Sequence, residues 1–173
     1  MVKVKKRKLR DPETMTYRRG VGIVLFNDKG KVFVAQRLDS PGPAWQMPQG
    51  GIDKGETPLE AAWRELHEET GISSAAFLAE SKNWLRYELP LNLVGRLWKG
   101  RYRGQEQKWF AFLFLGQDDE VNIQGEHPEF SAWKWADFHT VPELIVPFKR
   151  TLYQQVVVAF EHLAKQVAAS RKP

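Results

Sequence analysis

The chain has 173 residues, 42% of them hydrophobic and 12% aromatic, which is enough to build one domain core and excludes a wholly disordered chain. It has no cysteine, which excludes disulfide scaffolds, zinc-thiolate sites, iron–sulfur clusters and cysteine nucleophiles. No apolar run approaches the roughly 18 residues of a membrane helix, and none follows the basic N-terminus as a secretory signal would. We therefore expect a cytoplasmic protein.

The net charge of +5 is a local property of the N-terminus. The first ten residues hold six of the 26 basic side chains and no acid, so 20 basic residues face 21 acidic ones elsewhere, a net charge of −1. We expect residues 1–16 to form a flexible basic arm that ends near the turn-like pair Asp11-Pro12. Residues 17–170 are expected to form a single domain.

The first predicted elements of that domain are two strands. Residues 20–26 (GVGIVLF) and 31–37 (KVFVAQR) flank an Asn-Asp-Lys-Gly turn, which predicts a β-hairpin. The Pro and Gly content of residues 38–44 indicates a loop, and residues 45–52 (WQMPQGGI) form a broken extended stretch.

The strongest helix signal begins at Pro58 and ends at about Thr70. Thr57 is a suitable N-cap, and Glu60 three residues later completes the pattern of a capping box. Gly71 is a natural C-terminal stop. One apolar stripe recurs at helical spacing and consists of Leu59, Ala62, Trp63 and Leu66.

The rest of the chain alternates between strands and helices. We predict one or two strands in residues 77–93, a buried strand at 109–115 and another strand at 131–135. A helical turn at 141–144 and a helix at about 148–169 follow. This order of elements predicts an α/β fold with a mixed β-sheet packed between helices.

Three carboxylates in the predicted helix point to chemistry. Glu65, Glu68 and Glu69 stand at positions i, i+3 and i+4, so they share one face and repel one another by ~0.2–0.5 kcal/mol per pair. Hard divalent cations such as Mg²⁺ prefer oxygen ligands and would relieve that repulsion. Arg64 can reach Glu68 at i+4. Taken alone, however, such a run is more often a solvated helix surface.

The loop that precedes this helix strengthens the metal interpretation. Gly50, Gly51 and Gly55 form a tight loop whose backbone N–H groups can favour phosphate, although turn geometry alone would also explain these glycines. With Glu56 and the segment from Arg64, residues 50–72 match every fixed position of the Nudix box, and the chain resembles the Nudix hydrolase family. The resemblance implies the Nudix fold, an α/β/α sandwich with a mixed sheet, and Mg²⁺- or Mn²⁺-dependent hydrolysis of a nucleoside diphosphate linked to another moiety.

Segments outside the box resemble the branch of the family that contains bacterial RNA pyrophosphohydrolases and dinucleoside polyphosphate hydrolases. These segments are residues 17–18, 45–51, 84–90, 107–110 and 148–150. The longer basic arm and the proline-rich loop at residues 39–43 depart from the branch, which leaves the preferred substrate length open.

The resemblance also implies site residues. Two or three metal ions would be held by Glu65, Glu68, Glu69, Glu120 and the Gly50 carbonyl, with Arg64 and Glu56 as supporting residues. The catalytic carboxylates would be Glu68, Glu69 and Glu120, and either Glu69 or Glu120 would accept the proton of the attacking water. The substrate would contact Arg18, Arg37, Tyr87, Lys108, Phe148 and Lys149. Arg37 and Lys108 would grip phosphates, and Phe148 with Arg37 would sandwich a base.

The leading expectation is a Mg²⁺-dependent RNA pyrophosphohydrolase that converts 5′-triphosphate RNA ends to 5′-monophosphates and so initiates mRNA decay. One alternative is a hydrolase of diadenosine tetra- or pentaphosphate that uses the same site. A non-catalytic RNA-binding module of Nudix fold is a remote alternative, because every box carboxylate is kept. We expect a monomer, and a protein activator cannot be read from the sequence. The basic arm either attracts RNA in a salt-dependent way or merely aids solubility.

Overall fold

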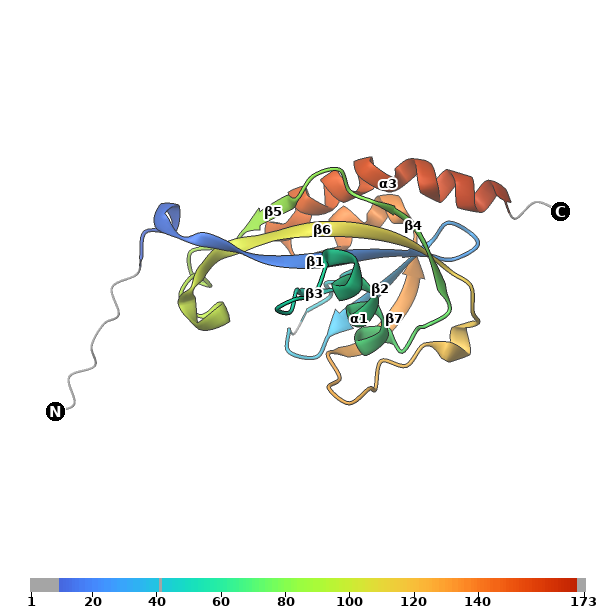
Figure 1. Ribbon diagram of the computed structural model, residues 1–173, viewed down its shortest axis with the longest axis horizontal. Coiled ribbons are helices and arrows are strands. Elements are labelled where there is room, and N and C mark those ends of the chain that lie inside the picture. Colours follow the sequence, from blue (N-terminus) through green and yellow to red (C-terminus); the bar gives the residue numbers. More distant parts are fainter. Residues whose placement is uncertain (1–9, 41, 171–173) are drawn as a thin grey trace.

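The structure of the protein is a computed structural model (Figure 1), and it describes residues 10–40 and 42–170. Residues 1–9 of the expected arm lie outside the described residues. The described part of that arm is structured, because Pro12–Thr14 form a 3-10 helix whose first turn is capped by the Asp11 carboxylate. The first strand begins at Thr16.

A seven-stranded mixed sheet forms the centre of the molecule. Its main strand order is β4-β6-β1-β2-β7, while β3 pairs with β1 and β5 pairs with β6. The β1–β6 pair is parallel and the other pairs are antiparallel. The strands are β1 (Thr16–Phe26), β2 (Val32–Arg37), β3 (Gln49–Gly51), β4 (Ala75–Glu80), β5 (Leu85–Glu88), β6 (Tyr102–Phe114) and β7 (Phe130–Ala136). The predicted hairpin is confirmed as β1 and β2.

Helices cover both faces of the sheet (Figure 1). The α-helices are α1 (Pro58–Thr70), α2 (Val141–Leu144) and α3 (Arg150–Ser170). Short 3-10 helices are Pro12–Thr14, Leu97–Gly100, Asp118–Glu120, Phe138–Thr140 and Pro147–Lys149. No helix in residues 10–40 and 42–170 is both long and apolar enough to cross a membrane.

The bounds of α1 are those that its capping residues predict. The Thr57 hydroxyl accepts a hydrogen bond from the Glu60 N–H at 3.2 Å, which satisfies one free donor of the first turn. Gly71 ends the helix with φ of +72°, a left-handed conformation that a side chain disfavours.

The core is divided into two clusters by the sheet. Val21, Ile23 and Leu25 of β1 pack on the α1 side, whereas Val24 and Phe26 pack on the α3 side. This alternation follows from the two-residue period of a strand that is buried on both faces. The expected α/β/α sandwich is confirmed.

Strand β6 is longer than predicted, because it begins at Tyr102 and not at Trp109. Its first half is polar, and the sequence pattern therefore gave no strand signal there. Pairing with β1 on one side and β5 on the other extends the strand, and it buries Gln105 and Gln107 to 1% exposure each.

Candidate active site

Six glutamates line one cavity of about 550 Å³, which we call the acidic groove. Three come from α1, one from the 3-10 helix Asp118–Glu120 and two from the segment before β7; they are Glu65, Glu68, Glu69, Glu120, Glu126 and Glu129. Carboxylate oxygens are the ligands that Mg²⁺ prefers. Within the described ranges, no three acidic, histidine or cysteine side chains converge closely enough to hold a metal ion as they stand. A side chain such as Glu68, which is 57% exposed, has room to turn inward.

Glu65 lies directly against Gly50. A Cβ added to Gly50 would be 2.0 Å from the Glu65 Cδ atom, so only glycine lets α1 approach β3 this closely. The Glu65 side chain is 13% exposed in this position. The structure thus brings together two of the residues that the box pattern singled out.

Arg64 ties the loop before α1 to the carboxylates. Its Nε and Nη2 donate to the two Glu56 oxygens at 2.7 and 2.8 Å, and Nη2 also donates to the Gly51 carbonyl at 3.0 Å. Its Nη1 donates to Glu65 at 2.8 Å and, as predicted from the i+4 spacing, to Glu68 at 3.2 Å. The bidentate contact from Arg64, helped by a backbone N–H, holds the pKa of Glu56 at about 2.

The inner carboxyls of the groove resist ionisation. Burial, followed by the neighbouring carboxyls of Glu129 and Glu65, raises the pKa of Glu69 well above its usual value. The Gln49 backbone N–H donates to the Glu69 Oε2 atom at 3.2 Å and opposes part of this shift. Burial also raises the pKa of Glu65 to about 6 despite its contact with Arg64. A bound divalent cation would favour the ionised form of all these groups.

Glu129 is a site residue that the sequence analysis missed. Its carboxyl lies beside Glu69 and shares a hydrogen bond with it. Its place depends on tertiary structure, because the Leu38 N–H donates to the Glu129 carbonyl at 2.8 Å where β2 and β7 meet. The only signal in the sequence is its position two residues before the predicted strand at 131–135.

Glu120 lines the same groove, but its carboxylate is hydrogen-bonded to the backbone after α1 and not to the other glutamates. The Glu120 Oε1 atom accepts hydrogen bonds from the backbone N–H groups of Ser73 and Ser74, both at 2.9 Å. These bonds lower the pKa of Glu120. The geometry therefore favours Glu129 over Glu120 as the partner of the α1 carboxylates.

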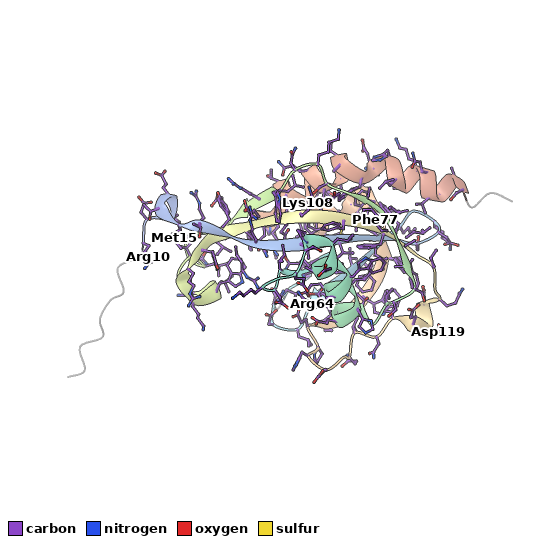
Figure 2. All side chains as sticks on the ribbon, viewed as in Figure 1. Arg10, Met15, Arg64, Phe77, Lys108 and Asp119 are labelled. Carbon is purple, nitrogen blue, oxygen red and sulfur yellow. The ribbon has the colours of Figure 1, made fainter. Side chains whose placement is uncertain are left out.

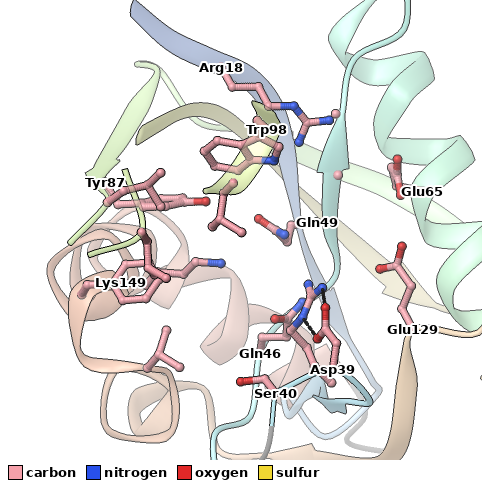
Figure 3. Close-up of a pocket in the computed structure, with 18 residues that line it drawn as sticks. Arg18, Asp39, Ser40, Gln46, Gln49, Glu65, Tyr87, Trp98, Glu129 and Lys149 are labelled. Atoms are coloured by element: carbon pink, nitrogen blue, oxygen red, sulfur yellow. Dashed lines mark hydrogen bonds and ion pairs between the residues drawn. The ribbon is translucent and has the colours of Figure 1, made fainter. Parts of the chain in front are cut away.

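A second cavity, of about 530 Å³, holds most of the predicted substrate residues; we call it the arginine pocket. Five of the six expected side chains line it, namely Arg18, Arg37, Tyr87, Phe148 and Lys149. Figure 3 shows Arg18 and Trp98 at one end and Asp39, Ser40 and Gln46 at the other. The Arg18 guanidinium stacks on the Trp98 ring at 5.4 Å from its centroid.

Arg37 is held in one orientation by a carboxylate. Its Nε and Nη2 atoms donate to the two oxygens of Asp39 at 2.7 and 2.8 Å (Figure 3). This bidentate contact raises the pKa of Arg37 and lowers that of Asp39. The Arg37 side chain is 33% exposed and lines the pocket, so it can contact a ligand there.

Aromatic rings and a lysine form the opposite wall of the pocket. The rings of Tyr87 and Phe148 lie 5.8 Å apart, and the Lys149 ammonium lies 4.9 Å from the centre of the Tyr87 ring. Burial, and then the nearby Arg37 charge, lowers the pKa of Lys149 to about 8. This wall offers a flat apolar surface for a base beside a cation for phosphate.

Lys108 is the expected substrate residue that the structure does not bring to the pocket. Successive side chains of a strand alternate between faces, and Lys108 stands on the face of β6 opposite to the buried Gln107. Its ammonium donates to the Lys82 carbonyl at 3.3 Å. Figure 2 shows it on β6, separate from Arg64 on α1.

The two cavities adjoin, because Glu65 and Glu129 line both of them. A ligand that fills the arginine pocket therefore extends toward the acidic groove across these two carboxyls. The arginine pocket offers cationic and aromatic walls, and the acidic groove offers carboxylate oxygens that suit divalent cations. Together they suit a nucleoside polyphosphate.

Comparison with known proteins agrees with this geometry. The family model of the NUDIX domain matches residues 16–156. A protein of Rhodospirillum rubrum named RNA pyrophosphohydrolase is 61% identical over 143 residues, which cover 83% of this chain and 86% of the relative. One of the same name from Mesorhizobium japonicum is 51% identical over 166 residues, covering 90% of this chain and 96% of the relative.

Solved structures share the fold. The dihydroneopterin triphosphate pyrophosphohydrolase of E. coli superposes with a TM-score of 0.62 and 24% identity, covering 83% of this chain and 98% of that chain. A C. elegans Ap4A hydrolase binary complex gives a TM-score of 0.57 and 20% identity, covering 80% of this chain and 96% of that one. At these identities the likeness concerns the fold alone. The match of the domain and the identity to the relatives show that the chain belongs to the Nudix hydrolase family.

Proposed function

We propose that the protein is an RNA pyrophosphohydrolase, which converts the 5′-triphosphate end of RNA to a 5′-monophosphate. The observation that carries this proposal is the junction of the arginine pocket and the acidic groove at Glu65 and Glu129. It lets one ligand place its first bases in the pocket and its phosphates at the carboxylates. The names of the Rhodospirillum and Mesorhizobium relatives support the same activity.

Nudix hydrolases generally need divalent metal ions. We propose Mg²⁺ or Mn²⁺, two or three ions with substrate bound, held by Glu65, Glu68, Glu69 and Glu129 with the Gly50 carbonyl. The donor set fits such ions, because it consists of oxygens and because the crowded carboxyls have raised pKa values that a cation would lower. Bound ions would neutralise the phosphates and make the attacking water more acidic.

The side chains of the protein supply the other parts of the reaction. Arg37 and Lys149 hold phosphate oxygens, and a base stacks between Arg37 and Phe148. Arg64 holds the Glu65 carboxylate in place through the contact given above. We assign the acceptance of the water's proton to Glu129, whose carboxyl faces both cavities.

A hydrolase of diadenosine tetraphosphate is the second candidate, because its substrate would fit the same joined cavities. Parallel measurement of kcat/KM on a triphosphorylated oligonucleotide and on diadenosine tetraphosphate separates the two. We expect the larger value on RNA, and a much larger value on the dinucleotide would overturn the assignment. A non-catalytic RNA-binding module is disfavoured, because all the box carboxylates are in place.

We also propose that the protein is a monomer, as expected from the sequence. The role of the basic arm in attracting RNA stays a proposal from the sequence, and residues 1–9 lie outside the described part of the chain.

A further inference from the structure

A buried row of polar side chains runs behind the arginine pocket. Gln105, Gln107 and Trp109 alternate along β6 and so share one face of the strand, and each is only 1% exposed. Buried amides are costly unless they form hydrogen bonds. Two of them in one strand therefore call for a reason other than packing.

Hydrogen bonds connect this row to two residues that line the pocket, Tyr87 and Gln49. The Tyr87 hydroxyl donates to the Gln105 Oε1 atom at 2.9 Å. The Gln107 Nε2 atom donates to the same oxygen at 3.1 Å and to the Gln49 Oε1 atom at 2.7 Å. Tyr87 and Gln49 both line the arginine pocket.

Trp109 sets the direction of these bonds. The indole N–H is a donor only, and it donates to the Gln107 Oε1 atom at 3.1 Å. The Gln107 oxygen therefore faces Trp109, and its NH₂ group faces Gln105 and Gln49. Gln105 keeps its oxygen toward two donors even though its own Nε2 atom has no hydrogen-bond partner within the described residues.

The fixed orientation of Gln107 also sets the orientation of the Gln49 side chain. Because its oxygen faces Gln107, its NH₂ group is turned toward the pocket, where Gln49 lies between Tyr87 and Glu65 in Figure 3. Its backbone N–H donates to the Glu69 Oε2 atom at 3.2 Å. One residue thus presents a donor to the pocket and holds a carboxylate of the acidic groove.

We propose that Gln107, oriented by Trp109, is a positioning residue that fixes Gln49 with its side-chain donor toward the substrate phosphates and its backbone on Glu69. This inference rests on the proposed function, since it deepens the description of the same site. Gln107 touches no substrate itself. Through Gln105 and Gln49 it links Tyr87 of the pocket to Glu69 of the groove, so that these two side chains keep a fixed relative position.

The test is the substitution Gln107→Met, which keeps the volume and removes both hydrogen-bonding groups. Outer hydrogen-bond partners of a metal site typically contribute about 10–100-fold, and we expect a loss of kcat/KM of that order on triphosphorylated RNA. Affinity for inorganic pyrophosphate, measured by calorimetry with Mg²⁺ present, is expected to fall as well. Phe160→Leu is the matched control, because Phe160 is a 1% exposed residue of the same core cluster without a place in the hydrogen-bond row.

Two further variants test the direction of the bonds. Gln107→Glu offers acceptors only in its ionised form, in which it draws the Gln49 NH₂ inward and turns the Gln49 oxygen toward the phosphates. It should lower pyrophosphate affinity more than Gln107→Met does. Trp109→Phe leaves Gln107 in place without its fixed orientation and should give a smaller loss than either.

The inference is overturned if Gln107→Met matches Phe160→Leu in both pyrophosphate affinity and kcat/KM at a temperature where both variants are folded. Equal pyrophosphate affinity of the Met and Glu variants would overturn the role of bond direction. If Gln107→Met lowers pyrophosphate affinity while the wild-type protein leaves triphosphorylated RNA intact, the proposed function is refuted and the positioning role is supported.

Discussion

The acidic groove and the arginine pocket adjoin, yet the groove holds unbalanced charges and the pocket holds a paired one. The groove gathers carboxyls that no cation in the described part of the chain fully balances, and burial together with this crowding raises the pKa values of Glu69 and Glu65. The pocket pairs its central cation, Arg37, with Asp39 in a bidentate contact. By the proposal above, an added cation would complete the groove, whereas the pocket is formed before a ligand arrives.

This difference has a consequence for how each region should respond to substitution. Neutralising an inner carboxyl of the groove such as Glu69, whose pKa is raised, removes a ligand but also relieves repulsion, so activity and stability should change in opposite directions. Neutralising a charge in the pocket breaks the ion pair of Arg37 and Asp39 and should mainly weaken substrate binding. The expected effects below run from the largest to the smallest.

Glu69→Gln should remove the largest share of activity. Glu69 is a proposed metal ligand, and a bound cation supplies several kcal/mol of transition-state stabilisation, so we expect kcat to fall by about 10³-fold or more. Without metal, Tm should hold or rise, because a buried carboxyl with a raised pKa is replaced by a neutral amide. The rise in Tm that Mg²⁺ gives the wild type should shrink. Kinetics and calorimetry with and without Mg²⁺ measure both, and undiminished hydrolysis would refute the assignment.

Glu129→Gln and Glu120→Gln form a matched pair within the groove. Glu129 lies beside Glu69, so its loss should lower kcat by on the order of 10²-fold. Glu120 binds the backbone of Ser73 and Ser74, so its substitution should lower Tm and should lower kcat less than Glu129→Gln does. Steady-state kinetics and thermal melts of both variants check this ranking. The reverse order of kcat would restore Glu120 as the catalytic carboxylate.

Lys149 gives the pocket a pH dependence of its own. Its pKa of about 8 means that the ammonium is charged below this pH and neutral above it. For phosphate binding that requires the charge, kcat/KM should fall roughly tenfold per pH unit above 8. Lys149→Arg should move this limb to higher pH, because the guanidinium stays protonated. An identical alkaline limb in the variant would show that another group titrates.

The same lysine affects stability with a defined sign. Its folded pKa is below its usual value of 10.5, so the unfolded chain binds more protons between about pH 8 and 10.5. Stability should therefore rise with pH across this window, by linkage. Lys149→Met removes that rise, which denaturant unfolding at several pH values can measure.

Asp39→Asn should have the smallest effect of the set. Asp39 is 68% exposed, and exposed ion pairs contribute no more than about 1 kcal/mol, or about fivefold in KM. Arg37 would lose its fixed orientation and kcat should change little. A loss above tenfold would show that the pocket is less preformed than the structure indicates.

The sequence predicted those parts of the site that depend on local spacing. Thr57 and Gly71 bound α1, and Arg64 reaches Glu68 because four residues make about one helical turn. Glu129 could not be found in this way, because the β2–β7 register carries it to Glu69 from a distant part of the chain. Lys108 was misplaced for a similar reason, since the strand that sets its face begins in polar sequence without a strand pattern.

The central claim is that the groove and the pocket act as one site, and titration of a ligand into an inactive protein tests it most directly. A triphosphorylated dinucleotide would be added with Mg²⁺ to the Glu69→Gln variant while backbone amide NMR signals are followed. The account predicts that residues near Phe148 and near Glu68 shift together with one dissociation constant, and that a monophosphorylated dinucleotide shifts only the pocket. Shifts confined to one region at saturating triphosphate, or two separate dissociation constants, would contradict it.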